Sequence, residues 1–173
     1  MRVLMRFDLS SLGVLGLAVA SSLTVLWWMD QSGLRNEAQA AESAAISAPA
    51  TGGPAQVLKE PDGHYWADVR IDGRAIHAMV DTGASVMVLT KEDAVRLGLG
   101  LKPDDFDAKL VTASGPVAAA PVRLRSVSVS GARVENVEAL VVAEGLPHSL
   151  LGMSYLGRLS SFTATPAALT LTP

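Results

Sequence analysis

The chain has 173 residues, a formal net charge of -3 and no cysteine, and 49% of its residues are hydrophobic. This length fits one domain of ordinary size with additional segments. The lack of cysteine excludes disulfides, thiol catalysis and zinc–cysteine sites, and the scattered Lys and Arg residues argue against a nucleic-acid partner.

An uncharged apolar run occupies residues 9–29, after a short N-terminal stretch, residues 1–8, that carries Arg2 and Arg6. About 20 apolar residues span the hydrocarbon core of a bilayer. Trp27-Trp28 closes the run, and aromatic residues are enriched at membrane interfaces. The run therefore predicts a transmembrane signal-anchor, with residues 1–8 in the cytoplasm and the rest of the chain exported.

A cleaved signal peptide is the alternative, because Ala38-Gln39-Ala40 resembles a cleavage site. Either way, the domain is exported. Residues 30–56 are rich in Ala, Ser, Gly and Pro, a composition that cannot bury enough apolar surface to fold. They predict a flexible linker, which leaves residues 57–173 as the globular domain.

Repeated short apolar alternations across this domain predict a mostly β fold. Asp72-Gly73 is a strong hairpin signal between two of the runs. Strands and hairpins are expected at residues 64–71, 75–80, 86–89, 109–122, 122–129, 134–142 and 162–171.

One short helix is expected over residues 91–97, with Thr90 as N-cap and Gly98 as C-cap. The loop that follows carries three close carboxylates. Because they lack the spacing of a calcium-binding loop, we expect a solvated turn at Asp104, Asp105 and Asp107.

The sequence Asp81-Thr82-Gly83-Ala84-Ser85 lies between two apolar runs. This position predicts a tight loop between two strands, which would fix the Asp81 carboxylate while its oxygens face a cleft. Such a group can activate water. An ordinary turn is the alternative, because Asp and Gly are common turn residues. Further along the chain, Leu150-Leu151-Gly152 predicts a buried strand end followed by a short helix.

These two motifs, at this spacing, resemble those of the retropepsin-type aspartic proteases. The string at residues 150–156 is similar to one bacterial branch of membrane-anchored, single-domain members, and the resemblance covers residues 63–171. It implies an acid protease fold, a small closed β-barrel with one or two short helices. It also implies that two such subunits pair to form one active site.

The resemblance assigns a role to each motif residue. Asp81 corresponds to the catalytic aspartate, Thr82 to the residue that braces the partner's loop, and Gly83 to the source of the tight loop geometry. Leu150, Leu151 and Gly152 correspond to the segment that packs behind this loop. Substrate-binding positions on the loop and on the covering flap correspond to Ala84, Ser85, Thr112, Ala113, Ser114 and Gly115.

Peptide hydrolysis without a metal or a covalent nucleophile needs one carboxylate to activate water and a second acid to protonate the leaving amide. The chain has a single Asp-Thr-Gly, so the second carboxylate must come from another copy. We therefore expect a homodimeric aspartic endopeptidase of the bacterial inner membrane, facing the periplasm, with no cofactor or metal. Its expected substrates are extended polypeptides, among them periplasmic parts of membrane proteins.

Two departures from the family pattern, Pro116 after the flap glycine and a turn without glycine at residues 165–167, leave the strength of the dimer open. The main alternative function is a catalytically silent module that binds peptides by strand addition. A serine hydrolase using Ser85 and His148 would lack the G-x-S-x-G elbow, and a zinc peptidase would lack H-E-x-x-H. A purely structural tether has no specific support.

Overall fold

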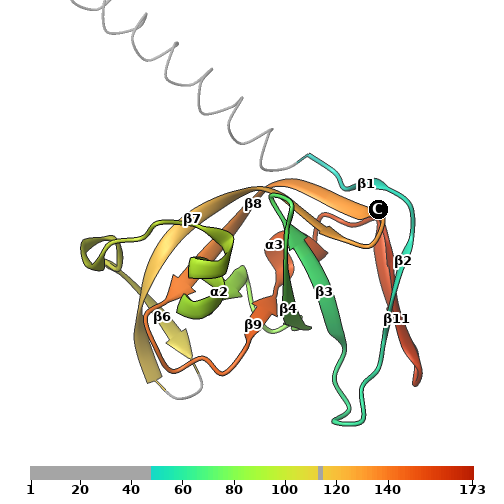
Figure 1. Cartoon of the computed structure of the whole chain (residues 1–173). Helices are drawn as coiled ribbons and strands as arrows, with labels where there is room; N and C mark the ends of the chain where they lie inside the picture. Colours follow the sequence, from blue (N-terminus) through green and yellow to red (C-terminus); the bar gives the residue numbers. More distant parts are fainter. Residues whose placement is uncertain (1–47, 113–114) are drawn as a thin grey trace, which may run out of the picture. The chain divides into compact units, whose positions relative to one another are not determined.

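The structure, a computed structural model, describes residues 48–112 and 115–173 (Figure 1). The apolar run at residues 9–29 and most of the expected linker lie outside the described residues. Within the described residues, we find no helix that is both long enough and apolar enough to cross a bilayer. The membrane anchor therefore stays a prediction.

The described residues form strands for most of their length. The strands are β1 (Thr51–Gly52), β2 (Ala55–Leu58), β3 (Trp66–Ile71), β4 (Arg74–Val80), β5 (Met87–Leu89), β6 (Ala108–Thr112), β7 (Gly115–Val129), β8 (Ala132–Val142), β9 (Ser149–Leu151), β10 (Ser161–Ala164) and β11 (Ala168–Thr172). An eight-stranded sheet has the order β1-β8-β5-β9-β4-β3-β7-β6, and β7 also pairs with β8. A smaller sheet has the order β10-β11-β2.

The helices are few and short: α2 (Lys91–Leu97), the 3-10 turn η1 (Pro103–Asp105) and α3 (Met153–Leu156). The predicted mostly β fold with one or two short helices is thus confirmed. Closure of the sheet into a barrel stays a prediction.

The first hairpin forms as the alternation predicts. Ala67, Val69 and Ile71 of β3 are buried, and the residues between them face outward. The turn uses Asp72 and Gly73, whose φ angles of 48° and 90° are both positive, as a tight two-residue hairpin requires. The hairpin delivers β4, and with it Asp81, to one end of the sheet.

The predicted helix at residues 91–97 is confirmed as α2. The Thr90 side chain accepts a hydrogen bond from the backbone N–H of Asp93 (3.1 Å), and Gly98 ends the helix with a φ of 73°. The acidic loop turns as η1, in which Asp105 accepts from the backbone N–H of Lys102 (2.6 Å).

The sequence placed the start of the domain too late. Residues 51–58, partly assigned to the linker, contribute β1 and β2. Composition suggested a linker because these residues are small, but small residues also allow close packing. A Cβ atom on Gly52 would collide with the carbonyl oxygen of Gly131, and Gly53 donates to the same oxygen (3.2 Å). A second correction is that β7 is one continuous strand where the sequence predicted a hairpin arm and a separate strand.

Arg158 ties the beginning of the described chain to the domain. Its Nε donates to the carbonyl oxygen of Ala48 (2.7 Å), its Nη1 donates to that of Glu135 (2.5 Å), and its own carbonyl accepts from Ala50 (3.0 Å). The buried residues of the main core lie between Ala50 and Leu171. This part of the chain therefore carries its own complete core.

Because Tyr155 is buried, the stability of the domain depends on pH in the alkaline range. The Tyr155 ring is fully buried and its hydroxyl donates to the carbonyl oxygen of Ala132 (3.0 Å). Burial raises the pKa of Tyr155 to about 12. An unfolded tyrosine has a pKa of about 10, so between these values the unfolded chain loses the proton while the folded chain keeps it. The free energy of unfolding must then fall as pH rises through this window.

We therefore expect a steeper alkaline loss of stability in the wild type than in Tyr155→Phe. Above pH ~12, the wild type should have lost about 2–3 kcal/mol more of its free energy of unfolding than the variant has. At neutral pH the variant should itself be less stable by about 1–2 kcal/mol, because it loses a buried hydrogen bond. Urea unfolding of both proteins from pH 7 upward measures this, and parallel pH profiles would contradict it.

Candidate active site

Three strands meet behind the loop at residues 81–86. Strand β9 lies between β4 and β5, parallel to β4 and antiparallel to β5. Leu151 is opposite Val80, and Leu150 is opposite both Met79 and Val88. The chain thus leaves β4, passes over the end of β9 and enters β5. The structure brings the motif at residues 150–152 next to the Asp-Thr-Gly motif.

Hydrogen bonds fix Asp81 from two sides. Its backbone N–H donates to the carbonyl oxygen of Leu151 (3.2 Å), and its Oδ1 accepts from the backbone N–H of Gly83 (2.8 Å). The backbone N–H of Ala84 closes the turn on the Asp81 carbonyl oxygen (3.3 Å). Asp81 is half-buried, while Thr82, Gly83 and Ser85 are exposed. The carboxylate is therefore oriented by its own loop and still reachable from solvent.

Gly152 lets α3 approach the loop closely. The backbone N–H of Met153 donates to the carbonyl oxygen of Ala84 (2.8 Å). A Cβ atom on Gly152 would lie 2.7 Å from that oxygen and would collide with the carbonyl oxygen of Val86. Only a glycine fits between these two carbonyl groups without moving the loop.

Ser154 braces the outgoing end of the loop, a role that the sequence motifs did not predict. Its hydroxyl accepts from the backbone N–H of Met87 (2.9 Å) and donates to the carbonyl oxygen of Glu138 (2.7 Å). One side chain therefore links α3, β5 and β8 behind the loop.

A buried polar network, also not predicted from the sequence, joins α2 to β9. The Ser149 hydroxyl donates to Oδ2 of Asp93 (2.6 Å) and accepts from the backbone N–H of Thr90 (3.1 Å). Ser149 is fully buried. A possible signal was a serine directly ahead of two leucines, in a strand whose other side chains are apolar. The network positions the strand whose carbonyl group holds Asp81.

We expect Ser149→Ala to lower the free energy of unfolding by about 2–3 kcal/mol, because it leaves a buried carboxylate oxygen and a buried N–H without their partner. Ser160→Ala is the matched control, since Ser160 is exposed and its hydroxyl donates to the carbonyl oxygen of Pro173 at the surface. The control should change stability by less than about 0.5 kcal/mol. Urea unfolding of both variants is the measurement, and equal losses would refute the role of the network.

The hairpin of β6 and β7 occupies the position of the expected flap. Thr112 is opposite Gly115, and the Thr112 hydroxyl donates to the Gly115 carbonyl oxygen (2.8 Å). The expected tip residues, Ala113 and Ser114, lie outside the described residues. Val111 is 82% exposed beside the tip, which leaves an apolar side chain facing solvent.

An apolar cluster connects the flap hairpin to the strands of the loop. Its buried members are Val88, Ala119 and Val142. Leu150 and flap residues Leu110 and Val117 pack against it. Leu150 belongs to β9, the strand that supports Asp81. This strand therefore shares an apolar cluster with the flap hairpin.

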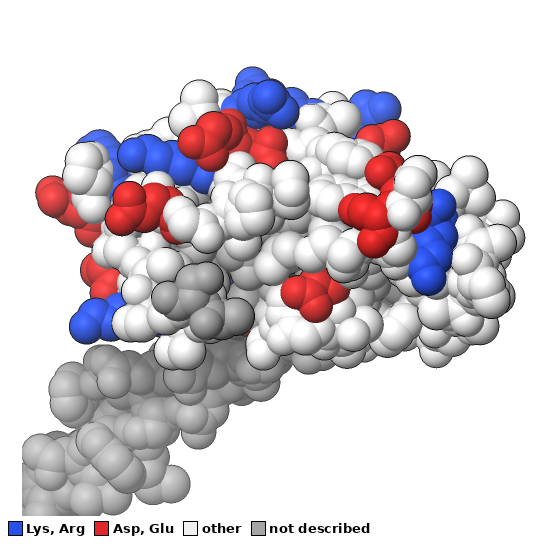
Figure 2. Space-filling view, turned by 90° about the horizontal axis from the view of Figure 1, so that it is seen from below, with Lys and Arg blue, Asp and Glu red and all other residues white. Residues whose placement is uncertain are grey.

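Charged residues lie mostly around the edge of the domain face that Figure 2 shows. Its centre and lower part are largely uncharged apart from one isolated acidic side chain. In Figure 1, β4 runs downward to the loop at residues 81–86, so the loop belongs to the side seen from below. A surface depleted of charge is typical of the core of protein–protein interfaces.

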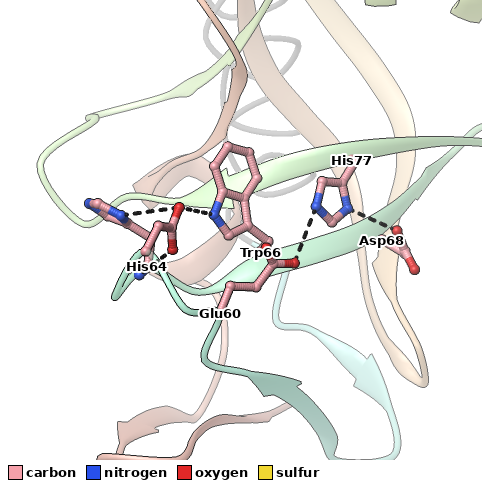
Figure 3. Close-up of polar contacts among 6 residues, drawn as sticks. Glu60, His64, Trp66, Asp68 and His77 are labelled. Atoms are coloured by element: carbon pink, nitrogen blue, oxygen red, sulfur yellow. Dashed lines mark hydrogen bonds and ion pairs between the residues drawn. The ribbon is translucent and has the colours of Figure 1, made fainter.

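Figure 3 shows Trp66 of the first hairpin between His64 and His77. Its ring stacks on His77 at 5.2 Å between centroids and meets the edge of His148 at 4.8 Å. His77 is held by Asp68 (3.0 Å) and lies 3.7 Å from Glu60. His148 therefore contacts Trp66, and among the described residues no hydrogen bond joins it to Ser85, as a serine hydrolase would need.

Asp62 fastens the preceding loop to the same tryptophan. It accepts from the backbone N–H of His64 (2.9 Å) and from Nε1 of Trp66 (2.8 Å). These two hydrogen bonds, that of His64 first, lower the pKa of Asp62. Within residues 48–112 and 115–173, no group of three or more His, Asp or Glu side chains could hold a metal ion.

A family model described as "gag-polyprotein putative aspartyl protease" matches residues 67–158, more than half of the chain. Among solved structures, the crystal structure of a retropepsin-like aspartic protease from Rickettsia conorii matches with a TM-score of 0.60 and 35% sequence identity. This match covers 70% of the present chain and 92% of the other. Residues 67–158, which the family model matches, include the Asp-Thr-Gly loop and strands β4, β5 and β9 that support it.

Two curated relatives are uncharacterized proteins. The one from the cobV 5' region of Sinorhizobium sp. is 42% identical over 99 residues, which are 57% of this chain and 42% of that protein. Protein RP867 of Rickettsia prowazekii is 41% identical over 106 residues, which are 61% of this chain and 46% of that protein. In each case, the match spans less than half the length of the relative.

Proposed function

Since the chain belongs to the retropepsin-like aspartic proteases, we propose that it is an aspartic endopeptidase and that it acts as a homodimer. Members of this family typically act as dimers on polypeptide substrates. The observation that carries the proposal is the Asp81 loop. One oxygen of its carboxylate accepts a hydrogen bond from the Gly83 N–H, the half-buried side chain is still reachable from solvent, and the sequence contains this motif once.

In the proposed dimer, the two Asp81 carboxylates face each other across a two-fold axis. Two carboxylates this close cannot both carry a charge comfortably, so they share a proton. The ionised group takes a proton from a water molecule, which attacks the peptide carbonyl, and the protonated group then donates to the leaving nitrogen. Thr82, exposed at the tip of the loop, would brace the partner's loop across the axis.

The substrate is expected to be an extended polypeptide. It would lie between the Asp81 loops and the β6–β7 hairpins, with Ala84, Ser85, Thr112 and Gly115 along its path. The apolar surface formed by Leu150 and the flap residues favours apolar side chains next to the cleaved bond.

The location is proposed from the apolar run at residues 9–29. It would anchor the protein in the bacterial inner membrane by a single span and place the protease domain in the periplasm. Confinement near the bilayer favours the periplasmic parts of membrane proteins as substrates. Mass spectrometry of exported proteins with and without the enzyme tests this, and accumulation of soluble targets alone would count against it.

The function itself is tested by cleavage of a mixed peptide library. We expect fragment 44–173 to cleave the library, with a rate that rises as roughly the square of protein concentration when the protein is dilute, because each active site needs two chains. A rate proportional to concentration would contradict the dimer. No cleavage by a folded, dimeric fragment would favour the silent peptide-binding module instead.

A further inference from the structure

A groove of about 350 Å³ lies on the outer face of β3, β7 and β8, next to the hairpin turn at Asp72-Gly73. The groove forms because its lining side chains differ in size. Ser126 and Ser128 of β7 form its floor, and long arginine side chains rise on either side, from Arg70 on β3 and Arg133 on β8. Two small residues between large ones leave a trough on this face of the sheet.

The strand register aligns these residues in one row. Arg70 is directly opposite Ser128, and Ser128 is directly opposite Arg133. Directly opposed residues point to the same face of a sheet. Neighbouring strands are about 4.8 Å apart, so the two arginines flank a hydroxyl group at a backbone separation of about 10 Å. Their side chains can therefore close on one small ligand above Ser128.

Positively charged side chains outnumber negatively charged ones along the groove. Arg125 lies 3.7 Å from Asp72 at one end, and Arg133 donates to its neighbour Glu135 (2.5 Å). Arg70 has only a long contact to the carbonyl oxygen of Gly73 (3.4 Å), and within the described part of the chain no carboxylate pairs with it. Three arginines against two carboxylates leave one positive charge over, on a chain whose formal net charge is -3.

We propose that Arg70, Ser128 and Arg133 form a binding site for a phosphate group. A guanidinium group matches phosphate geometry with paired N–H donors. A tetrahedral phosphate has enough oxygens to accept hydrogen bonds from two guanidinium groups and one hydroxyl at once. A carboxylate has only two oxygens and fits this set of donors less well. The phosphate can belong to a phospholipid headgroup or to a soluble phosphate, and both present the same chemistry.

The site lies away from Asp81 and next to the start of the domain. Arg70 sits at the hairpin end of β3 and β4, while Asp81 follows the other end of β4, about 20 Å along the strand. Thr51 of β1, by which the chain joins the large sheet, is directly opposite Arg133. A domain held at this site by lipid phosphate would turn its Asp81 loop away from the bilayer.

The first test uses fragment 44–173, a compact unit that contains the whole core. Titration with inorganic phosphate, followed by NMR, should shift the signals of Arg70, Ser128 and Arg133. Arg70→Gln should weaken the binding about tenfold, by the loss of a charge-assisted hydrogen bond. Arg96→Gln is the matched control, because it removes the same charge from α2, away from the groove, and should leave the affinity unchanged.

The second test separates the two sources of phosphate. The fragment is sedimented with phosphatidylcholine vesicles that contain or lack phosphatidylglycerol. Binding that requires phosphatidylglycerol and falls in Arg70→Gln but not in Arg96→Gln supports a lipid headgroup, while phosphate binding without vesicle binding supports a soluble phosphate. If inorganic phosphate leaves the three signals unmoved, or if both variants lose binding equally, the site does not exist. None of these readouts depends on proteolysis.

Discussion

Asp81→Asn should abolish peptide cleavage while leaving the fold intact. Asparagine has the same shape as aspartate, and its amide oxygen can still accept the hydrogen bond from Gly83 that holds the side chain (2.8 Å). The amide cannot take a proton from water or share one with a second carboxylate. Loss of this acid–base function should reduce the cleavage rate at least about a thousandfold.

The matched control for this variant is Asp104→Asn. Asp104 lies in the exposed turn η1, far along the chain from the loop, and the same chemical change there should not alter the rate. Both variants should unfold in urea at concentrations close to the wild-type value. Residual cleavage by Asp81→Asn at a rate near that of the control would show that Asp81 does not perform the chemistry.

The same variant also tests the dimer. If wild type and Asp81→Asn are mixed in equal amounts and pair at random, about a quarter of the dimers contain two wild-type chains. Activity should then fall to about a quarter of the value for the same total amount of wild type, provided that a single Asp81 is not enough. A fall to only one half would mean that each chain works alone.

Gly152→Ala should damage both the fold and the activity. The φ angle of Gly152 is -94°, which alanine adopts easily, so the effect comes only from space. The added methyl group would lie 2.7 Å from the carbonyl oxygen of Ala84 and would collide with that of Val86. Both obstacles are backbone atoms of the Asp81 loop, so they cannot move aside as a flexible side chain could.

We expect this variant to lose about 3 kcal/mol or more of its free energy of unfolding, at the upper end of what overpacking costs. Cleavage should be lost with it, because the loop that positions Asp81 must shift. Gly53→Ala is the control, since a methyl group there meets no atom within 4 Å. Urea unfolding and library cleavage measure both effects, and a Gly152→Ala protein as stable as the control would contradict the packing argument.

The local pattern of the sequence was enough to predict the elements that depend on near neighbours. Alternation predicted β3, the Asp72-Gly73 turn needs only two residues that tolerate positive φ angles, and the Thr90 and Gly98 caps define α2 within ten positions. The Asp-Thr-Gly loop was also identified in this way, because its chemistry and its turn are encoded in consecutive residues.

Composition was misleading where small residues pack against a distant segment. Gly52 looked like part of a linker, although its lack of a side chain is what allows the chain to pass Gly131. Nothing near Gly52 in the sequence indicates that contact, since the two glycines are far apart in the chain and meet only through the pairing of β1 with β8.

The sequence by itself thus determined the mostly β class, the hairpins, and the aspartate that the family uses. Only the tertiary structure decided how that aspartate is held: by β9 inserted between β4 and β5, by Ser149 bonded to Asp93, and by Ser154 bridging three elements. The physical reason is sequence separation. Each of these contacts joins polar groups from distant segments, and only the folded sheet brings them within hydrogen-bonding distance.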